Sequence, residues 1–566
     1  MLRVFRNDLL DTGQFVVTLE LVPGREHGGK SVNTVMQIAS DAFSDGRISA
    51  VSMTDNPGGN PSLSPDVLGY EVFKLGLDVI VHFTCRDMNR VGIESRALQL
   101  AMMGMKNILA LTGDYAGQGF AGQGAPVFDM DSVSLQCLMA MLSERINAAG
   151  DPDSFFTGCA VSPFKYTEAE SFAQYAKLCR KVSAGAQFVI TQLGYDAAKY
   201  QELIRIQNRA GFNLPILGSV YILSPGAARL MNQGKVPGAV VPDALLQTVQ
   251  KEWTDPAVGR KAGIERAARL GVVLKGLGYR GIHIGGVHRS FEPVARILDR
   301  MAQIENRWEE FVGDFSYHPA NGFYSFPDKD FGCVIGRGWP TKAYPLPAAF
   351  PKSLSEKLYV FGPGDNSRTA PVNYGQKPVK PHFSDRLHYH LLELAHRFFF
   401  NSDASLAPVY RALSRWIDAR VFARTLLHLF ENVGKQILLG CRQCGDCAIQ
   451  YVAFQCPESG CPKHIRNGAC GGSRNGRCEV YPDRWCIWYR AYQRWASVHR
   501  TDEMVRGCVP PRKWELDHSS SWLNFHLGRD HQNGSADFAR YCCARSACSH
   551  AGDGLCSGQK QGGAVT

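Results

Sequence analysis

Six polar positions, each just after a short apolar run in the first 200 residues, could support acid–base or ligand-binding chemistry. They are Glu20, Thr54, His82, Asp114, a Ser162-Pro163 pair and Gln192. A carboxylate can hold or release a proton, and the other side chains can form hydrogen bonds with a bound molecule. Any one of them could instead be a turn or helix-cap residue, as an aspartate after a strand often is. Six in succession favour a shared cavity.

The elements that would position these residues are eight apolar runs alternating with helical patterns over residues 1–310. Strands are expected at 15–21, 48–53, 77–82, 108–111, 156–161, 187–192, 214–218 and 281–285. This alternation is typical of a (β/α)8 barrel, in which ligands bind at the carboxyl ends of the strands. We therefore predict an α/β fold of the TIM-barrel type. A doubly wound open sheet is the competing fold, but no G-x-G-x-x-G follows the first strand.

The bulk composition is that of an ordinary globular protein. The chain has 566 residues, of which 45% are hydrophobic and 20% are charged, so it is long enough for more than one domain. No apolar run reaches the ~18 residues of a membrane span, and the N-terminus lacks the long apolar core of a secretory signal. We expect a cytoplasmic protein that does not bind membranes.

The cysteines are concentrated in the last third of the chain. Eight of the 18 lie between Cys441 and Cys486, beginning with a C-x2-C-x2-C run. In a cytosolic chain such clustering indicates metal or redox chemistry rather than disulfides. Thiolates at these spacings suit tetrahedral zinc or an iron–sulfur cluster, and spacing alone does not decide between them. The predicted ligands are Cys441, Cys444 and Cys447, with Cys456 or Cys461 as the fourth, although eight thiols could also form two sites.

The cysteine-rich stretch is also basic. From Cys441 to Lys513 there are twelve Arg or Lys residues and six Asp or Glu residues, a net +6 of the chain's +10. Six arginines between 466 and 494 interleave with aromatic residues, as in a nucleic-acid-binding zinc module. A docking face for an acidic electron carrier or for another polyanionic ligand explains the same charge. We favour this second interpretation and disfavour nucleic acid.

Four segments are predicted from these patterns. Residues 1–310 form the barrel, and 311–400 a connector rich in Pro, Gly and aromatic residues, with Cys333 isolated in it. Residues 401–540 form a mostly helical and irregular cysteine-rich domain that binds a metal or an iron–sulfur cluster, and 541–566 a disordered tail. Helical patterns resume at 387–400 and 406–439.

Short motifs along the whole first domain resemble those of the methylenetetrahydrofolate reductases. They are TLELVPG, VSMTDNPGGN, VHFTC, LTGD, VFDMDSVSL and RKVSAGAQFVITQLGYD. The first is altered from the family's usual FEFFPP, and Thr112 and Ser162 stand where Arg and Tyr are common in the family. The resemblance implies a TIM barrel with a flavin across its top, which reduces 5,10-methylenetetrahydrofolate to 5-methyltetrahydrofolate or runs in the opposite direction. FAD and FMN both remain open.

The resemblance also implies roles for individual residues. Glu20 would be the general acid, a role that calls for a pKa raised by burial. Gln192 would bind the pterin of the folate, and Asp114 would lie between flavin and pterin, where its charge disfavours an anionic reduced ring. The implied flavin contacts are Thr54, His82, Asp114, Ala160 and Lys181. For Lys181, a solvated lysine at a helix end is the alternative.

The segments NGACGG, GRCEV and CPK, within about residues 430–535, resemble the partner subunit of acetogen-type reductases, which contains zinc or iron–sulfur. This second resemblance implies electron entry through the C-terminal module from an electron-carrier protein, with NAD(P)H as the other possible donor. A homo-oligomer is expected. Two other functions stay open: a folate-dependent methyltransferase barrel with a thiolate-bound zinc, and a non-enzymatic electron relay or nucleic-acid scaffold.

Overall fold

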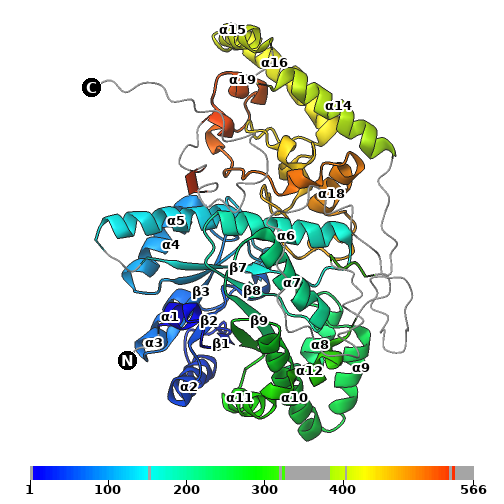
Figure 1. Ribbon diagram of the computed structural model, residues 1–566. Helices are drawn as coiled ribbons and strands as arrows, with labels where there is room; N and C mark the ends of the chain where they lie inside the picture. The colour runs from blue at the N-terminus through cyan, green and yellow to red at the C-terminus, as the bar shows by residue number, and fades with distance from the viewer. Residues whose placement is uncertain are drawn as a thin grey trace.

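A closed barrel of eight parallel strands forms the N-terminal domain in the computed structural model (Figure 1). The structure describes residues 4–150, 154–317, 322–325, 383–401, 405–533, 538, 540 and 541. The order around the barrel is β1-β10-β9-β8-β7-β4-β3-β2. The strands are β1 Val16–Leu21, β2 Ala50–Met53, β3 Asp78–Thr84, β4 Asn107–Leu111, β7 Phe156–Val161, β8 Phe188–Thr191, β9 Ile216–Tyr221 and β10 Gly281–Gly285. The predicted (β/α)8 barrel is confirmed.

Helices surround this barrel, and side-chain caps fix where several of them begin. They are α1 Phe5–Leu10, α2 Lys30–Asp45, α3 Pro65–Lys74, α4 Arg90–Met102, α5 Ser132–Ala148, α6 Glu168–Ser183, α7 Ala197–Ala210, α8 Pro225–Asn232, α9 Asp243–Glu252, α10 Pro256–Gly276, α11 Glu292–Ile304 and α12 Trp308–Phe311. Asp131 accepts hydrogen bonds from the first backbone N–H groups of α5, and Thr167 does so for α6. A short hairpin, β5 Gln118–Gly119 and β6 Gly122–Gln123, follows β4.

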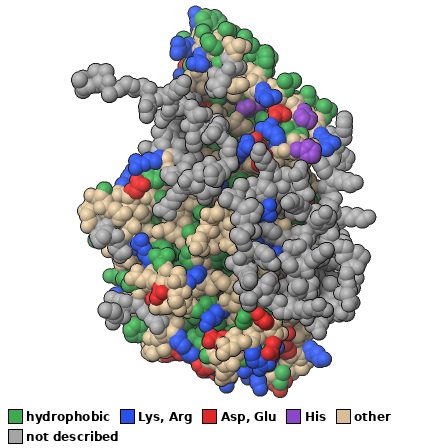
Figure 2. Space-filling model, in the orientation of Figure 1, with side chains coloured by type: hydrophobic (Ala, Val, Ile, Leu, Met, Phe, Trp, Pro, Cys, Tyr) green, Lys and Arg blue, Asp and Glu red, His purple; other side chains and the backbone are tan. Residues whose placement is uncertain are grey.

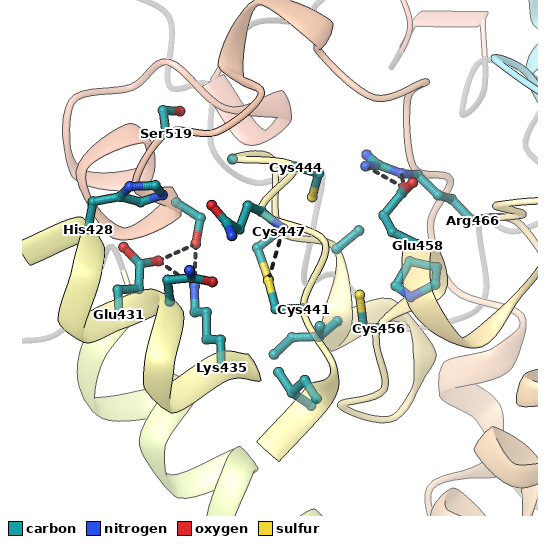
Figure 3. A pocket seen from close by; sticks show the side chains of 18 residues that line it. His428, Glu431, Lys435, Cys441, Cys444, Cys447, Cys456, Glu458, Arg466 and Ser519 are labelled. Carbon is teal, nitrogen blue, oxygen red and sulfur yellow. Dashed lines mark hydrogen bonds and ion pairs between the residues drawn. The ribbon is translucent and has the colours of Figure 1, made fainter. Parts of the chain in front are cut away.

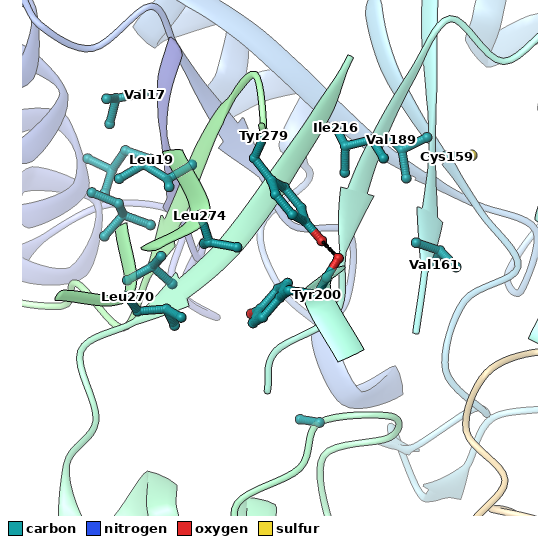
Figure 4. Packing of buried hydrophobic residues seen from close by; sticks show 14 of the residues in the cluster. Val17, Leu19, Cys159, Val161, Val189, Tyr200, Ile216, Leu270, Leu274 and Tyr279 are labelled. Carbon is teal, nitrogen blue, oxygen red and sulfur yellow. Dashed lines mark hydrogen bonds between the residues drawn. The ribbon is translucent and has the colours of Figure 1, made fainter. Parts of the chain in front are cut away.

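Apolar packing closes the amino-terminal end of the barrel. Phe5 of α1 lies inside, with its ring edge-on to Phe156 of β7 at 5.9 Å and to Phe188 of β8 at 5.4 Å. On the outside, Leu270 and Leu274 of α10 belong to the layer between strands and helices (Figure 4). Buried on both faces, the strands read as continuous apolar runs. Among the described residues, side chains therefore fill the amino-terminal end, and the carboxyl-terminal end is left for ligands.

The C-terminal module packs on the barrel next to α6 (Figure 1). Its helices are α14 Phe383–Phe399, α15 Ala407–Asp418, α16 Val421–Leu439, α17 Pro457–Gly460, α18 Ile487–Ser497 and α19 Ser521–His526. Phe172 of α6 and Tyr492 of α18 contact each other at a ring distance of 5.2 Å. The single helical pattern predicted at 406–439 is two helices, because the α-helical run ends at Asp418 and restarts at Val421.

Most of the aromatic residues that interleave with arginines are core residues of this module. Trp488, Tyr489 and Trp495 are buried in the apolar cluster around α18. Arg466 and Arg494 are buried as well. Buried rings cannot stack on nucleic-acid bases, so the pattern that suggested such a module has a structural explanation.

Apolar side chains lie exposed on the arm formed by α14, α15 and α16, where Figure 2 shows a green patch at the top of the molecule. Phe422, Phe430 and Ile437 of α16 are at least two-thirds exposed. No helix in the described part of the chain is long and apolar enough to cross a membrane. Most of the predicted connector, with Cys333, and residues 542–566 of the predicted tail lie outside the described residues.

Candidate functional site

A cavity of about 400 Å³ opens at the carboxyl-terminal end of the barrel strands. All seven residues predicted for the barrel site line it: Glu20, Thr54, His82, Asp114, Ala160, Lys181 and Gln192. They come from six strands or the turns after them and from α6. The barrel brings together residues that are up to 172 positions apart in the sequence.

Two of these residues present buried polar atoms that have no partner in the described part of the chain. They are Oγ1 of Thr54 and Nε2 of His82. Leaving a buried polar atom unsatisfied costs about 1–3 kcal/mol, which a bound polar ligand can recover. Burial lowers the pKa of His82 to about 4, so its ring is neutral near pH 7 and can accept a hydrogen bond.

Asp114 stands on the tight turn after β4. Gly113 has φ +93°, and a Cβ there would lie 3.0 Å from the Cβ of Thr84, so the turn needs glycine. The Asp114 carboxylate accepts a hydrogen bond of 2.9 Å from the Gly58 backbone N–H. Asp114 is not the cap of the next helix, because Asp131 caps α5. The carboxylate is instead part of the cavity wall.

Lys181 is buried at the end of α6 rather than solvated. Its Nζ donates a hydrogen bond of 2.7 Å to the Ala160 carbonyl at the end of β7. Burial lowers the pKa of Lys181 to about 8, so the ammonium form predominates at pH 7 and is lost as the pH rises through 8. An anionic ligand group beside it would raise this pKa and keep the charge at higher pH.

The expectation of a raised pKa for Glu20 is wrong for the protein without ligand. Burial by itself raises the pKa of this carboxyl, but the close approach of His283 and the charges of His82 and His288 outweigh burial. The net pKa of Glu20 is below its ordinary value. Nε2 of His283 lies 3.8 Å from Oε2 of Glu20. His283, which lies beyond the predicted site, is therefore the main group that favours the ionised carboxylate.

His283 of β10 is a cavity residue that we did not predict. Its Nδ1 lies 2.8 Å from Oγ1 of Thr18 on β1, so the ring orientation is fixed by a neighbouring strand. The signal in the sequence was the single polar residue inside the apolar run GIHIG. Tyr221 at the end of β9 also lines the cavity, and the sequence analysis did not predict it either.

The Gln192 amide is held by backbone groups in this state of the cavity. Its oxygen accepts a hydrogen bond of 2.8 Å from the Leu193 N–H, and its nitrogen donates one of 2.9 Å to the Pro237 carbonyl. The amide oxygen and the amide nitrogen therefore each have a partner. A bound pterin would replace one of these hydrogen bonds or donate a second hydrogen bond to the amide oxygen.

The C-terminal module supplies part of the cavity wall. Its contributions are Lys463, Cys470, Gly471, Gly472 and Glu479. Nζ of Lys463 donates a hydrogen bond of 2.8 Å to the carbonyl of Gly113, next to Asp114. The sequence did not predict that residues from the cysteine-rich stretch would reach the barrel site.

Four of the five predicted metal ligands line a second, smaller cavity inside the module (Figure 3). They are Cys441, Cys444, Cys447 and Cys456. Burial raises the pKa of Cys444 to about 12 and that of Cys447 to about 11, so metal binding there would have to displace protons. Across the described residues, we find no three His, Cys, Asp or Glu side chains already arranged to hold a metal ion. Zinc and iron–sulfur therefore stay predictions.

Cys461 does not line that cavity. Burial raises its pKa to about 11, and the charge of Cys478 adds to the rise. Burial and the charges of Cys470 and Cys461 likewise raise the pKa of Cys486. Each of these pKa shifts includes the charge of another cysteine, so the four thiols lie near one another. The group is Cys461, Cys470, Cys478 and Cys486, and Cys470 also lines the barrel cavity.

Comparison with known families decides what kind of barrel this is. A family profile described as methylenetetrahydrofolate reductase matches residues 6–301, which is more than half of the chain. The chain belongs to the methylenetetrahydrofolate reductase family. A second profile, described as the methylene-tetrahydrofolate reductase C terminal, matches residues 422–515 of the cysteine-rich module. The expected likeness to the acetogen-type partner subunit stays a prediction.

Individual members of the methylenetetrahydrofolate reductase family align at low identity. A probable methylenetetrahydrofolate reductase (NADPH) of Caenorhabditis elegans is 26% identical over 273 residues, which cover 46% of this chain and 38% of that protein. Methylenetetrahydrofolate reductase 1 of Schizosaccharomyces pombe is 24% identical over 271 residues, covering 47% and 43%. A 5,10-methylenetetrahydrofolate reductase of Pectobacterium carotovorum is 25% identical over 222 residues, covering 38% and 67%. The chain thus spans less than half the length of the first two relatives.

Proposed function

We propose that this protein is a flavin-dependent enzyme that reduces 5,10-methylenetetrahydrofolate to 5-methyltetrahydrofolate. The observation that carries the proposal is that seven positions, chosen from the sequence alone, line one cavity at the end of the barrel where ligands bind. Membership of the reductase family and relatives that bear the same activity in their names support it.

The flavin would lie against Thr54, His82, Asp114, Ala160 and Lys181. The unpartnered Oγ1 of Thr54 and Nε2 of His82 suit the polar edge of a flavin ring, because a ring carries both donors and acceptors. Bound there, the flavin would supply the hydride, and the protein would supply orientation and electrostatics. FAD and FMN are both compatible with these residues.

Glu20 is proposed as the general acid that protonates the leaving nitrogen when the folate's five-membered ring opens. Its carboxylate is ionised in the ligand-free protein because His283 and its neighbours lower the pKa. A folate stacked in the cavity would exclude water from Glu20, and desolvation shifts a carboxyl pKa upward. We therefore propose that Glu20 takes up its proton with the substrate. Gln192 would orient the pterin through its amide.

The first test is an absorption spectrum of full-length protein purified without oxygen, with iron and zinc assayed on the same sample. Flavin absorption together with reduction of methylenetetrahydrofolate would support the proposal. Bound zinc without flavin, combined with methyl transfer from a folate, would replace it with the methyltransferase alternative. A protein that binds neither flavin nor folate would contradict both.

Lys181 predicts a pH dependence of flavin binding. Because the pKa of Lys181 is about 8, its ammonium form is present at pH 7 and largely lost at pH 9. If the ammonium contacts an anionic flavin group, affinity should fall about tenfold between pH 7 and pH 9. Fluorescence titration of the flavin-free protein measures this fall. The Lys181→Met variant should bind more weakly at pH 7 and show no such fall, and an equally steep pH dependence in the variant would exclude Lys181.

The four cysteines of the inner cavity are proposed to hold the metal of the C-terminal module, as zinc or as part of an iron–sulfur cluster. Cys447→Ser should lose at least half of the metal bound at this site, because a four-ligand site with a missing thiolate binds poorly. Metal analysis of the full-length variant checks the loss. Cys137→Ala, which removes a buried thiol of α5 outside both cysteine groups, should keep the wild-type metal content. Unchanged metal in Cys447→Ser would remove Cys447 from the site.

Electrons would reach the flavin from NAD(P)H or, through the module, from an electron-carrier protein. The position of Cys470 supports the route through the module. This residue lines the barrel cavity and also lies near Cys486 of the module. A homo-oligomer remains part of the proposal, and sedimentation of the purified protein would test it. Cytoplasmic localisation likewise remains a proposal.

A further inference from the structure

We propose that Lys463 is a positioning residue which the C-terminal module inserts into the barrel site, where its ammonium group sets the charge next to Asp114. The inference rests on the proposed flavin function. It adds a residue from outside the barrel, about 350 positions along the chain from Asp114, to the machinery of the reaction. Its consequence is that the module is part of the active site and not only an attached domain.

The contacts of Lys463 fix its position closely. Its side chain is only 4% exposed, and its Nζ donates a hydrogen bond of 2.8 Å to the carbonyl of Gly113. The same nitrogen forms an ion pair with Glu479, whose side chain is 9% exposed. The charges of Lys463 and Asp114 also interact. Both members of the Lys463–Glu479 pair line the barrel cavity, so a ligand there would meet them.

Anchoring the module does not require Lys463, because other buried lysines already do this from the barrel side. Lys165 donates a hydrogen bond to the carbonyl of Ser473, and Lys177 donates one of 3.2 Å to the carbonyl of Gly468. Neither side chain is part of the cavity wall. Lys463 runs in the opposite direction, from the module to the turn that carries Asp114, and ends at the cavity.

The module backbone is shaped to bring Glu479 to the same place. A Cβ at Gly472 would lie 1.4 Å from Oε2 of Glu479, so a larger residue there would displace the acid from this position. The other carboxylate oxygen, Oε1, lies 3.2 Å from Sγ of Cys470. Lys463 and Glu479 are therefore held as an oriented pair, with the cation on the side of Gly113 and Asp114.

A buried charge beside a redox ring changes the balance between its oxidised and reduced forms. A cation favours an anionic reduced ring, and an anion disfavours it, more strongly in a water-poor cavity than in solvent. Asp114 acts against reduction, and Lys463 opposes this effect. Removing the Lys463 charge should therefore make the flavin harder to reduce, whereas removing the Glu479 charge should make it easier to reduce.

The experiment measures the ratio of reduced to oxidised flavin in full-length, flavin-loaded protein, at a fixed potential set by a reference dye without oxygen. Lys463→Met should lower this ratio about tenfold, which is about 30 mV for a two-electron couple. Glu479→Gln should raise it, and Lys463→Arg should stay within about twofold of wild type because the charge is kept. Tyr492→Phe is the control: it removes the hydrogen bond from Tyr492 to Glu168 at the same interface without removing a charge, outside the cavity wall, and the ratio should stay at the wild-type value.

Opposite shifts in Lys463→Met and Glu479→Gln support the proposal, since mere loosening of the module would move both ratios in the same direction. Equal ratios in wild type and both variants, with flavin bound, overturn it while leaving the proposed reductase function intact. A wild-type chain that binds no flavin contradicts the proposed function, and this inference with it. If Lys463→Met does not fold, the other two variants test the proposal. A raised ratio in Glu479→Gln with a ratio near wild type in Lys463→Arg supports it, and an unchanged ratio in Glu479→Gln overturns it.

Discussion

Replacing Glu20 by glutamine is expected to lower the rate of methylenetetrahydrofolate reduction about 1,000-fold, the middle of the range for loss of a general acid. Glutamine keeps the size and hydrogen-bonding shape of the side chain but cannot give up a proton at the carboxyl position. Glu20 is not among the residues proposed to contact the flavin, so flavin content should stay at the wild-type level.

The two half-reactions separate the role of Glu20 from general damage. In Glu20→Gln, reduction of the flavin by dithionite should proceed as in wild type, and only reoxidation by the folate should be slow. Stopped-flow absorbance follows both steps. Glu71→Gln is the matched control, since it makes the same carboxylate-to-amide change in an exposed ion pair with Lys74 outside the cavity, and both steps should proceed as in wild type. Full folate turnover by Glu20→Gln would remove Glu20 from the mechanism.

Replacing Arg466 by methionine is expected to destabilise the C-terminal module by about 3–5 kcal/mol, as for one partner lost from a buried ion pair. Arg466 is 4% exposed and lies 2.9 Å from Oδ2 of Asp446 and 2.9 Å from Oε1 of Glu458. Both carboxylates are themselves buried, and His531 pairs with Asp446 from the other side. Methionine would leave Glu458 with only the longer contacts to His464 at 3.5 Å and to Arg512 at 3.9 Å.

Urea unfolding followed by tryptophan fluorescence measures this loss, because Trp488 and Trp495 lie in the core of the module. Arg296→Met on α11 is the matched control. Its ion pair with Glu292 is about 60% exposed on both sides, so the free energy of unfolding should change by at most about 1 kcal/mol. A small effect at Arg466 would mean that water or a rearranged side chain compensates for the lost guanidinium group.

The sequence by itself determined the barrel and most of its site. The strands predicted at 156–161 and 281–285 have the observed bounds, because strands buried on both faces must be continuous apolar runs. The carboxyl ends of such strands meet at one end of a barrel, so the polar residues after them had to share a cavity. Helix α4 was missed because Arg90–Met102 mixes polar and apolar residues without a clear amphipathic stripe.

Only the tertiary structure decided the charges and the partners within the site. The pKa of Glu20 depends on His283 and His288, which lie more than 260 residues away in the chain, and so its direction could not be predicted from burial alone. The grouping of cysteines is similar: Cys456 and Cys461 are five residues apart, yet only Cys456 lines the inner cavity, because the short helix Pro457–Gly460 separates them. Lys463 reaches Gly113 only because the module folds back onto the barrel. Spacing along a chain specifies local structure, whereas contacts between distant segments depend on how whole domains pack.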